Sequence, residues 1–208
     1  FGIAGSGMHL NLSMSKNGEN VFYDENDTIG LSKTAYSFIA GIMDHIKGIT
    51  AITNPLVNSY KRLVPEFEAP VYIAWSAQNR SPLIRVPSAR GSCTRIELRS
   101  ADPSANPYLA LAVTIAAGLN GVKKGLVPPP AVNGNIYSMT AAQRKKHRIG
   151  ALPASLEEAL IELQKDKFIC DVLGTHVLEK YVEAKKLEWL EYKTRVSQWE
   201  IDRYLTKY

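Results

Sequence analysis

Arg95-Ile96-Glu97-Leu98-Arg99 is the stretch that decides the fold class, because charged and apolar side chains alternate in it without interruption. Alternation of this kind is typical of a β-strand with one buried face. The other face would carry Arg95, Glu97 and Arg99 side by side. Burying three charges against a core is costly unless something pairs them. We therefore expect this strand to line a cleft.

A second alternating segment lies near the N-terminus, where residues 7–14 read Gly-Met-His-Leu-Asn-Leu-Ser-Met. The alternation places His9, Asn11 and Ser13 on one face and apolar side chains on the other, which predicts another half-buried strand. Polar residues follow, with Asn17-Gly18 as a turn signal. Two further short strands are predicted, over 71–75 and 83–86.

The predicted helices lie mainly in the second half of the chain. Regular spacing of apolar residues predicts one over 31–52, with Ser32 as its N-cap. Asn106-Pro107 opens a helix that runs to about residue 120, because proline is favoured at the first helical position. Capping-box pairs and apolar spacing predict three more, over 156–165, over 175–192 and from 198 onward. Residues 121–134 are expected to be loop and 135–154 irregular.

Strands thus dominate residues 1–100 and helices dominate residues 105–208. This segregation predicts an α+β fold rather than a doubly wound sheet, with an antiparallel sheet as the active-site face and helices behind it and toward the C-terminus. The sequence contains no P-loop, and no Gly-x-Gly-x-x-Gly links a strand to a helix. If the protein binds ATP, it does so by other means.

Composition narrows the class of protein. Of the 208 residues, 45% are hydrophobic and 22% are charged, which excludes disordered, collagenous and coiled-coil chains. No apolar run is long enough to predict a membrane span. Two cysteines without a Cys-x-x-Cys motif exclude a disulfide framework and a zinc ribbon, and favour the cytoplasm.

The net charge of +5 is unevenly distributed. Seven basic residues lie between 58 and 99, and six of them are arginines. Arginine is favoured where a planar, bidentate grip on carboxylate or phosphate is needed. The pattern favours a small anionic ligand over nucleic acid, and the basic run at 144–148 is expected to be a solvated loop.

Four motifs in order carry a family resemblance. They are Gly5-Ser6-Gly7-Met8-His9; Asn-Ser-Tyr-Lys-Arg-Leu-Val-Pro at 58–65 with Glu-Ala-Pro at 68–70; Asn-Arg-Ser at 79–81 with Ile-Arg-Val-Pro at 84–87; and 95–99 with Asp-Pro-Ser-Ala-Asn-Pro-Tyr at 102–108. Together they resemble the catalytic domain of prokaryotic type I glutamine synthetase, most closely the feedback-inhibited form of Gram-positive bacteria. The resemblance implies that residues 1–208 are the C-terminal part of that domain, without the N-terminal β-domain and the first catalytic strands.

The resemblance implies an activity. The parent enzyme would join ammonia to glutamate through γ-glutamyl phosphate at the expense of ATP, with Mg²⁺ or Mn²⁺ as cofactor. His9 and Glu97 would be ligands of one metal ion. Other metal ligands of the family lie on strands that precede the first motif, so this chain alone is expected to be inactive.

The resemblance also assigns roles to further residues. Glu68, on a flap, and Arg80 would be catalytic. The glutamate-binding residues would be Gly5, Arg62, Glu68, Arg80 and Arg99. The nucleotide-binding residues would be Asn11, Ser13, Arg80, Arg85 and Arg95. Arg90 is a candidate to replace a phosphate-contacting lysine. Tyr137 lies where the adenylylated form carries its modified tyrosine, but the neighbouring residues differ, and modification is not expected.

Several alternatives remain open from the residues alone. Taken singly, His9 could be structural and Arg62 a solvated cation at a helix end. A glutamate–amine ligase of the same superfamily would share His9, Glu97 and the arginines. A non-catalytic fragment could instead bind nitrogen transcription regulators. For the parent enzyme, the resemblance implies a homo-oligomer in the form of a double hexameric ring, without direct nucleic-acid or membrane binding.

Overall fold

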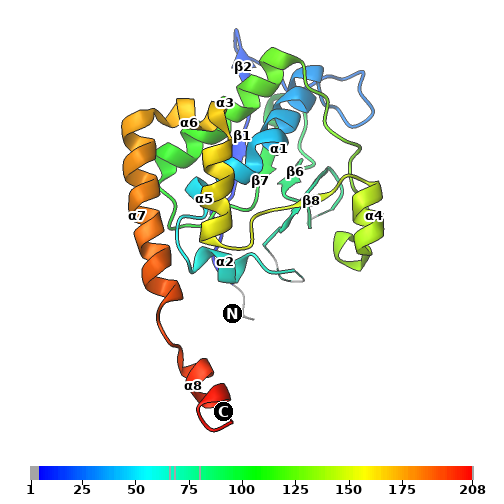
Figure 1. The fold of residues 1–208 in the computed structure, drawn as a ribbon. Helices are drawn as coiled ribbons and strands as arrows, with labels where there is room; N and C mark the ends of the chain where they lie inside the picture. The colour runs from blue at the N-terminus through cyan, green and yellow to red at the C-terminus, as the bar shows by residue number, and fades with distance from the viewer. Residues whose placement is uncertain (1–4, 66, 68, 80, 208) are drawn as a thin grey trace.

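A computed structural model describes residues 5–65, 67, 69–79 and 81–207 (Figure 1). Its central feature is a four-stranded sheet in the order β1-β7-β6-β5, formed by Leu10–Leu12, Ile96–Leu98, Ile84–Arg85 and Trp75–Ser76. β7 pairs antiparallel with both β1 and β6, whereas β5 and β6 are parallel. The register places Glu97 between Asn11 on one neighbouring strand and Arg85 on the other.

Two smaller sheets complete the β structure. β2 (Ser15–Lys16) and β3 (Glu19–Asn20) form a hairpin on Asn17 and Gly18, which have positive φ angles of 54° and 84°. Two positive φ angles suit the hairpin twist and confirm the predicted turn. β4 (Tyr72–Ile73) pairs with β8 (Gly150–Ala151). The segment predicted as one strand over 71–75 is therefore shared between two sheets.

Two long helices pack on each other against the sheet. α1 (Lys33–Thr53) contacts α3 (Pro107–Lys124) along its length, and it also contacts α5 (Leu156–Lys165). The hydroxyl of Ser32 accepts the N–H of Ala35 and caps α1, as predicted. The core lies between these helices and the sheet, and α1 supplies a stripe of fully buried isoleucines at helical spacing: Ile39, Ile42, Ile46, Ile49 and Ile52.

The remaining helices follow the chain to the C-terminus. α6 (Lys167–Leu173) and α7 (Thr175–Lys193) follow α5, and α8 (Gln198–Tyr204) extends beyond the body of the molecule (Figure 1). A one-turn helix, α2 (Ser59–Arg62), and a 3₁₀ turn, η1 (Gly91–Cys93), lie in the first half. None of the helices in the described part of the chain is long and apolar enough to cross a membrane.

The structure confirms the helices predicted over 31–52, 156–165 and 175–192, and corrects three expectations. α3 continues to Lys124 because Gly125, at φ 62°, supplies its left-handed cap. The segment 135–154 is not irregular: it contains η2 (Ile136–Ser138), α4 (Ala141–Lys146) and β8. α6 was not predicted; the carboxylate of Asp166 caps it by accepting the N–H of Ile169.

Candidate active site

Glu97 is the centre of the polar sheet face. Its carboxylate oxygen Oε1 lies 2.8 Å from Nδ1 of His9, and Arg85 Nη1 donates to the other oxygen, Oε2, at 2.9 Å. Glu97 is only 7% exposed, and a buried carboxylate needs hydrogen-bond partners. His9 and Arg85 supply one partner for each of its two oxygens. The register of β1, β7 and β6 makes the arrangement possible, because it brings the side chains of three strands to one place.

The pair of His9 and Glu97 fits part of a metal site. An imidazole nitrogen and carboxylate oxygens form a mixed donor set that suits a divalent cation such as Mg²⁺ or Mn²⁺. The His9 side chain is 36% exposed, which leaves its ring accessible. Among the described residues, no group of three or more His, Cys, Asp and Glu could hold a metal ion. A complete site therefore needs ligands beyond these two.

Arg62 is held in place by backbone carbonyls. Its Nη1 donates to the carbonyl of Ser100 at 2.8 Å and its Nη2 to that of Arg99 at 3.4 Å. Burial lowers the pKa of Arg62, and the positive charge of Arg99 acts in the same direction, while Asp102 opposes it. Arg62 is thus anchored and partly desolvated rather than a solvated cation at the end of α2.

Glycine in the first motif allows these groups to approach. A Cβ on Gly7 would lie 2.6 Å from Nη2 of Arg62 and 3.2 Å from Nε2 of His9. The guanidinium and the imidazole therefore flank the same point of the backbone. A Cβ on Gly5 would meet the Arg62 side chain at an ordinary 3.7 Å. The motif is glycine-rich at this point because another side chain at position 7 would displace a functional group.

Arg99 lies at the end of β7, next to the backbone that anchors Arg62. Its backbone N–H donates to Leu83 at 3.0 Å, and its Nη1 donates to the carbonyl of Pro82 at 3.4 Å. Two neighbouring guanidinium groups repel each other unless an anion lies between or beside them. The structure thus brings together the two arginines that the sequence assigns to the glutamate carboxylate, although it does not test that role.

A third group of side chains lies along β1. Arg95 Nε donates to Oδ1 of Asn11 at 3.2 Å, and its Nη1 donates to the carbonyl of Cys93 at 3.3 Å. Ser13 is exposed two residues beyond Asn11. These three predicted nucleotide-contact residues lie on the His9 side of the sheet. Glu68 and Arg80 lie outside the described residues, so their roles stay predictions.

Arg90, the candidate to replace a phosphate-contacting lysine, contacts backbone carbonyls in this structure. Its guanidinium donates to the backbone carbonyls of Ile29, Pro87 and Ala89. These bonds tie the connection between β6 and β7 to the loop that precedes α1. The predicted role of Arg90 at phosphate stays a prediction.

Tyr137 is a neighbour of the site that the sequence analysis did not use. Its hydroxyl is within hydrogen-bond distance of the backbone carbonyls of Phe67 and Ala69, at 3.3 and 3.5 Å. The positive charge of Arg99 acts on the same hydroxyl. In the sequence, Tyr137 is comparable to the modified tyrosine of the adenylylated form, but modification is not expected and no other role is assigned to it.

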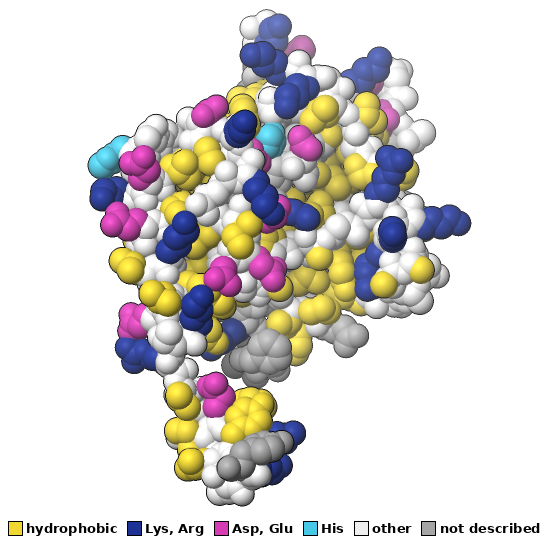
Figure 2. All heavy atoms as spheres, viewed as in Figure 1, with side chains coloured by type: hydrophobic (Ala, Val, Ile, Leu, Met, Phe, Trp, Pro, Cys, Tyr) yellow, Lys and Arg dark blue, Asp and Glu magenta, His cyan; other side chains and the backbone are white. Residues whose placement is uncertain are grey.

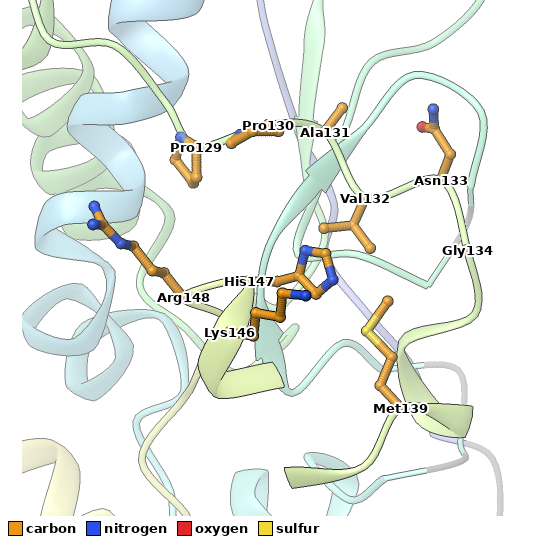
Figure 3. A pocket seen from close by; sticks show the side chains of 10 residues that line it. All are labelled: Pro129, Pro130, Ala131, Val132, Asn133, Gly134, Met139, Lys146, His147 and Arg148. Atoms are coloured by element: carbon orange, nitrogen blue, oxygen red, sulfur yellow. The ribbon is translucent and has the colours of Figure 1, made fainter. Parts of the chain in front are cut away.

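A separate cavity of about 450 Å³ lies outside the Glu97 cluster (Figure 3). One wall is the loop from Pro129 to Gly134, and side chains of Lys146 and His147 project from the end of α4 on the other side. Arg148, at the rim, has a positive φ of 56°. None of the predicted site residues that the structure describes lines this cavity.

An α+β domain whose sheet face joins an imidazole, a carboxylate and anchored guanidinium groups is typical of catalytic domains that act on anionic substrates. Comparison with known families agrees and is more specific. The family model "Glutamine synthetase, catalytic domain" matches residues 1–204. The chain belongs to this family.

Curated relatives are identical to this chain at more than half of the aligned positions. It is 56% identical over 207 residues to the glutamine synthetase of Thermus thermophilus and 56% identical over 208 residues to that of Clostridium saccharobutylicum. It is 52% identical to the glutamine synthetase of Staphylococcus aureus over 208 residues. Each comparison covers 100% of this chain but only 46–47% of the relative. The chain thus spans about half the length of the curated relatives it matches.

Solved structures show the same fold. A structure described as a GmaS/ADP complex matches with a TM-score of 0.83 and 31% sequence identity, over 97% of this chain and 46% of that one. The structure of apo GmaS without ligand matches with a TM-score of 0.82 and 35% identity, over 97% of this chain and 45% of that one.

Proposed function

We propose that this chain is the C-terminal part of the catalytic domain of an enzyme that forms glutamine from glutamate, ammonia and ATP through γ-glutamyl phosphate. The observation that carries the proposal is the double contact of Glu97, which links His9 on one side to Arg85 on the other. A ligase of this kind needs a metal-type donor set and a phosphate-type cation within reach of one another. Family membership over residues 1–204 supports the same conclusion.

The arginines account for the binding of the anionic substrates. Arg62 and Arg99 would bind the carboxylate of glutamate, and the backbone carbonyls that hold Arg62 fix the direction of its guanidinium. Gly5 would add a backbone contact to the same substrate. Arg85 and Arg80 would spread the negative charge of the phosphoryl group as it moves from ATP to the γ-carboxylate.

His9 and Glu97 would hold one divalent cation, which we propose to be Mg²⁺ or Mn²⁺. When bound, this cation neutralises charge on the nucleotide phosphates. Asn11, Ser13 and Arg95 would contact the nucleotide beside it. Arg85 keeps one oxygen of Glu97 occupied, which orients the carboxylate toward His9. Glu68 would favour ammonia and accept its extra proton.

We further propose that the enzyme assembles with copies of itself, in the double hexameric ring implied by its family. The segment around α8 supports this, because apolar side chains are exposed there beyond the body of the molecule (Figure 2). Val196, Trp199 and Leu205 are 70%, 63% and 77% exposed. Exposed apolar patches of this kind mark interfaces.

Nitrogen transcription regulators are proposed as additional partners. The cytoplasm is proposed as the location, where both cysteines would stay reduced.

The test is the reaction of the complete enzyme that carries this chain. We expect glutamine to form in equal amount with ADP, and only when glutamate, ammonia and a divalent cation are all present. Replacing ammonia by methylamine distinguishes the rival activity: a glutamate–amine ligase would use the larger amine with the higher kcat/KM. Folded enzyme that forms no γ-glutamyl product with either amine would contradict the proposal.

A further inference from the structure

The hydroxyl of Tyr137 reaches the backbone on both sides of position 68. It lies 3.3 Å from the carbonyl oxygen of Phe67 and 3.5 Å from that of Ala69. A phenolic hydroxyl has one proton, so it donates to these two carbonyls in turn. Phe67 is 37% exposed, whereas Ala69 is buried. The contact therefore links the exposed residue Phe67 and the buried residue Ala69 to the same hydroxyl.

Tyr137 itself is held from the side of the small β4–β8 sheet, not by the turn that it contacts. Its backbone N–H donates to the side chain of Asn135 at 3.0 Å. Its ring packs on Tyr72 of β4, with 5.8 Å between the ring centroids. The guanidinium of Arg144 lies 4.8 Å from the centroid of the same Tyr72 ring. The donor is thus preorganised independently of residues 67–69.

The electrostatic surroundings keep Tyr137 a hydrogen-bond donor. Burial raises the pKa of its hydroxyl, and the opposing effect of the Arg99 charge is smaller. The hydroxyl therefore stays protonated at neutral pH. Arg99, one of the two arginines assigned to the carboxylate of glutamate, is the charged group that acts on this hydroxyl.

We propose that Tyr137 is a positioning residue that holds the backbone at Phe67 and Ala69 and thereby sets the affinity of the enzyme for ammonia. The inference rests on the proposed function, which gives Glu68 the ammonium-binding role. Tyr137 acts through the backbone and takes no part in the chemistry. Because Glu68 lies between Phe67 and Ala69 in the sequence, we expect loss of the Tyr137 hydroxyl to affect ammonia binding more than phosphoryl transfer.

The chain supplies a matched pair of variants for the test in the complete enzyme. Tyr137→Phe removes the hydroxyl and keeps the ring contact with Tyr72. Tyr72→Phe is the control, because it removes a hydroxyl from the neighbouring ring. That hydroxyl forms no hydrogen bond to any described residue. For Tyr137→Phe we expect the KM for ammonia to rise about three- to tenfold, as for the loss of one neutral hydrogen bond, with the KM for ATP and kcat within about twofold. Tyr72→Phe should match the wild type.

Equal kinetics of the two variants would overturn the proposal. A rise of all KM values in Tyr137→Phe together with a lower Tm would also overturn it, because that result indicates a merely structural role. Amide hydrogen exchange over 64–70 gives a readout that does not depend on activity. Exchange there should be faster in Tyr137→Phe than in Tyr72→Phe; unchanged exchange contradicts the positioning role. If exchange is faster in Tyr137→Phe but the enzyme makes no glutamine, the positioning role holds and the proposed function is wrong.

Discussion

At the scale of single residues, the site depends on a buried carboxylate that is paired on both sides. Glu97 could not be 7% exposed as a carboxylate without His9 and Arg85, because an unpaired buried charge is strongly destabilising. The alternation of residues 95–99 predicts that Glu97 faces the site side of the sheet. It does not predict the partners, which lie 88 and 12 residues away in the sequence. Only the strand pairing supplies them.

Asp27 gives a pH-dependent prediction at the same scale. Burial opposes its ionisation, but the N–H groups of Leu31 and Ile29 and the hydroxyl of Tyr36 hold the pKa of Asp27 below its usual 3.8. A carboxylate with a lowered pKa stabilises the folded state above the unfolded-state pKa, and this contribution is lost as the pH falls through the folded-state value. We therefore expect Asp27→Asn to lower the free energy of unfolding by up to about 1 kcal/mol near neutral pH, after allowance for solvent screening.

The pH profile of that difference is the decisive part. The gap between wild type and Asp27→Asn should be constant above about pH 5 and should narrow below about pH 4, as measured by urea unfolding at several pH values. Glu25→Gln is the control, since Glu25 is exposed and bonds to no described residue. A gap that widens toward acid pH would show that the sign is wrong.

At the scale of helices and strands, the sequence predicts an element correctly where the residues that stabilise it are close together in the sequence. The capping hydroxyls of Ser32, Ser155 and Ser197 each accept a backbone N–H at the start of the helix that they predict. α4 and α6 were missed, and both are short. For α4 a local signal was present, because Thr140 and Gln143 form a capping box. For α6, the capping carboxylate of Asp166 also binds Nδ1 of the buried His45 at 2.8 Å, and that partner is 121 residues away. No local pattern records such a contact.

The packing of α1 on α3 gives a prediction about stability. A Cβ on Gly121 would lie 2.1 Å from the carbonyl oxygen of Ser37 and 2.6 Å from Cα of Gly41, both of them backbone atoms that cannot move aside cheaply. We expect Gly121→Ala to force the helices apart and to lower the free energy of unfolding by about 3 kcal/mol. Thermal unfolding followed by circular dichroism measures the change.

Gly134→Ala is the matched control for this substitution. A Cβ there meets nothing within 4 Å, and its φ lies outside the positive range in which glycine is required. Its effect should stay within about 0.5 kcal/mol. Similar Tm values for the two variants would contradict the close approach of the helices.

At the scale of the whole molecule, the fold class was predictable and the composition of the site was not. Segregation of strands and helices along the chain predicts the α+β architecture. The meeting of Arg62 from α2 with the backbone at Arg99 and with Gly7 follows from topology alone. The family resemblance supplied these residues because it compares whole motifs, whereas hydrophobic periodicity describes one element at a time.

The small number of metal ligands predicts how the isolated chain behaves. Within the described residues, His9 and Glu97 form the largest ligand group on the site face, and no cluster of three or more is present. Divalent cations that work with ATP need more oxygen ligands than this pair provides. We expect residues 1–208 alone to form no glutamine above background in a coupled assay with Mg²⁺ or Mn²⁺. Metal-dependent turnover by this chain would show that the site is complete without further ligands.

The most direct test of the central claim is the rate of ATP-dependent glutamine formation by the complete enzyme with Glu97→Gln, a change that keeps the shape of the side chain and removes its charge. We expect kcat/KM to fall by about 100-fold or more, with the circular dichroism spectrum unchanged. Glu19→Gln, at an exposed position on β3, should retain wild-type activity. If Glu97→Gln is folded and as active as Glu19→Gln, then the cluster of Glu97, His9 and Arg85 is not the active site.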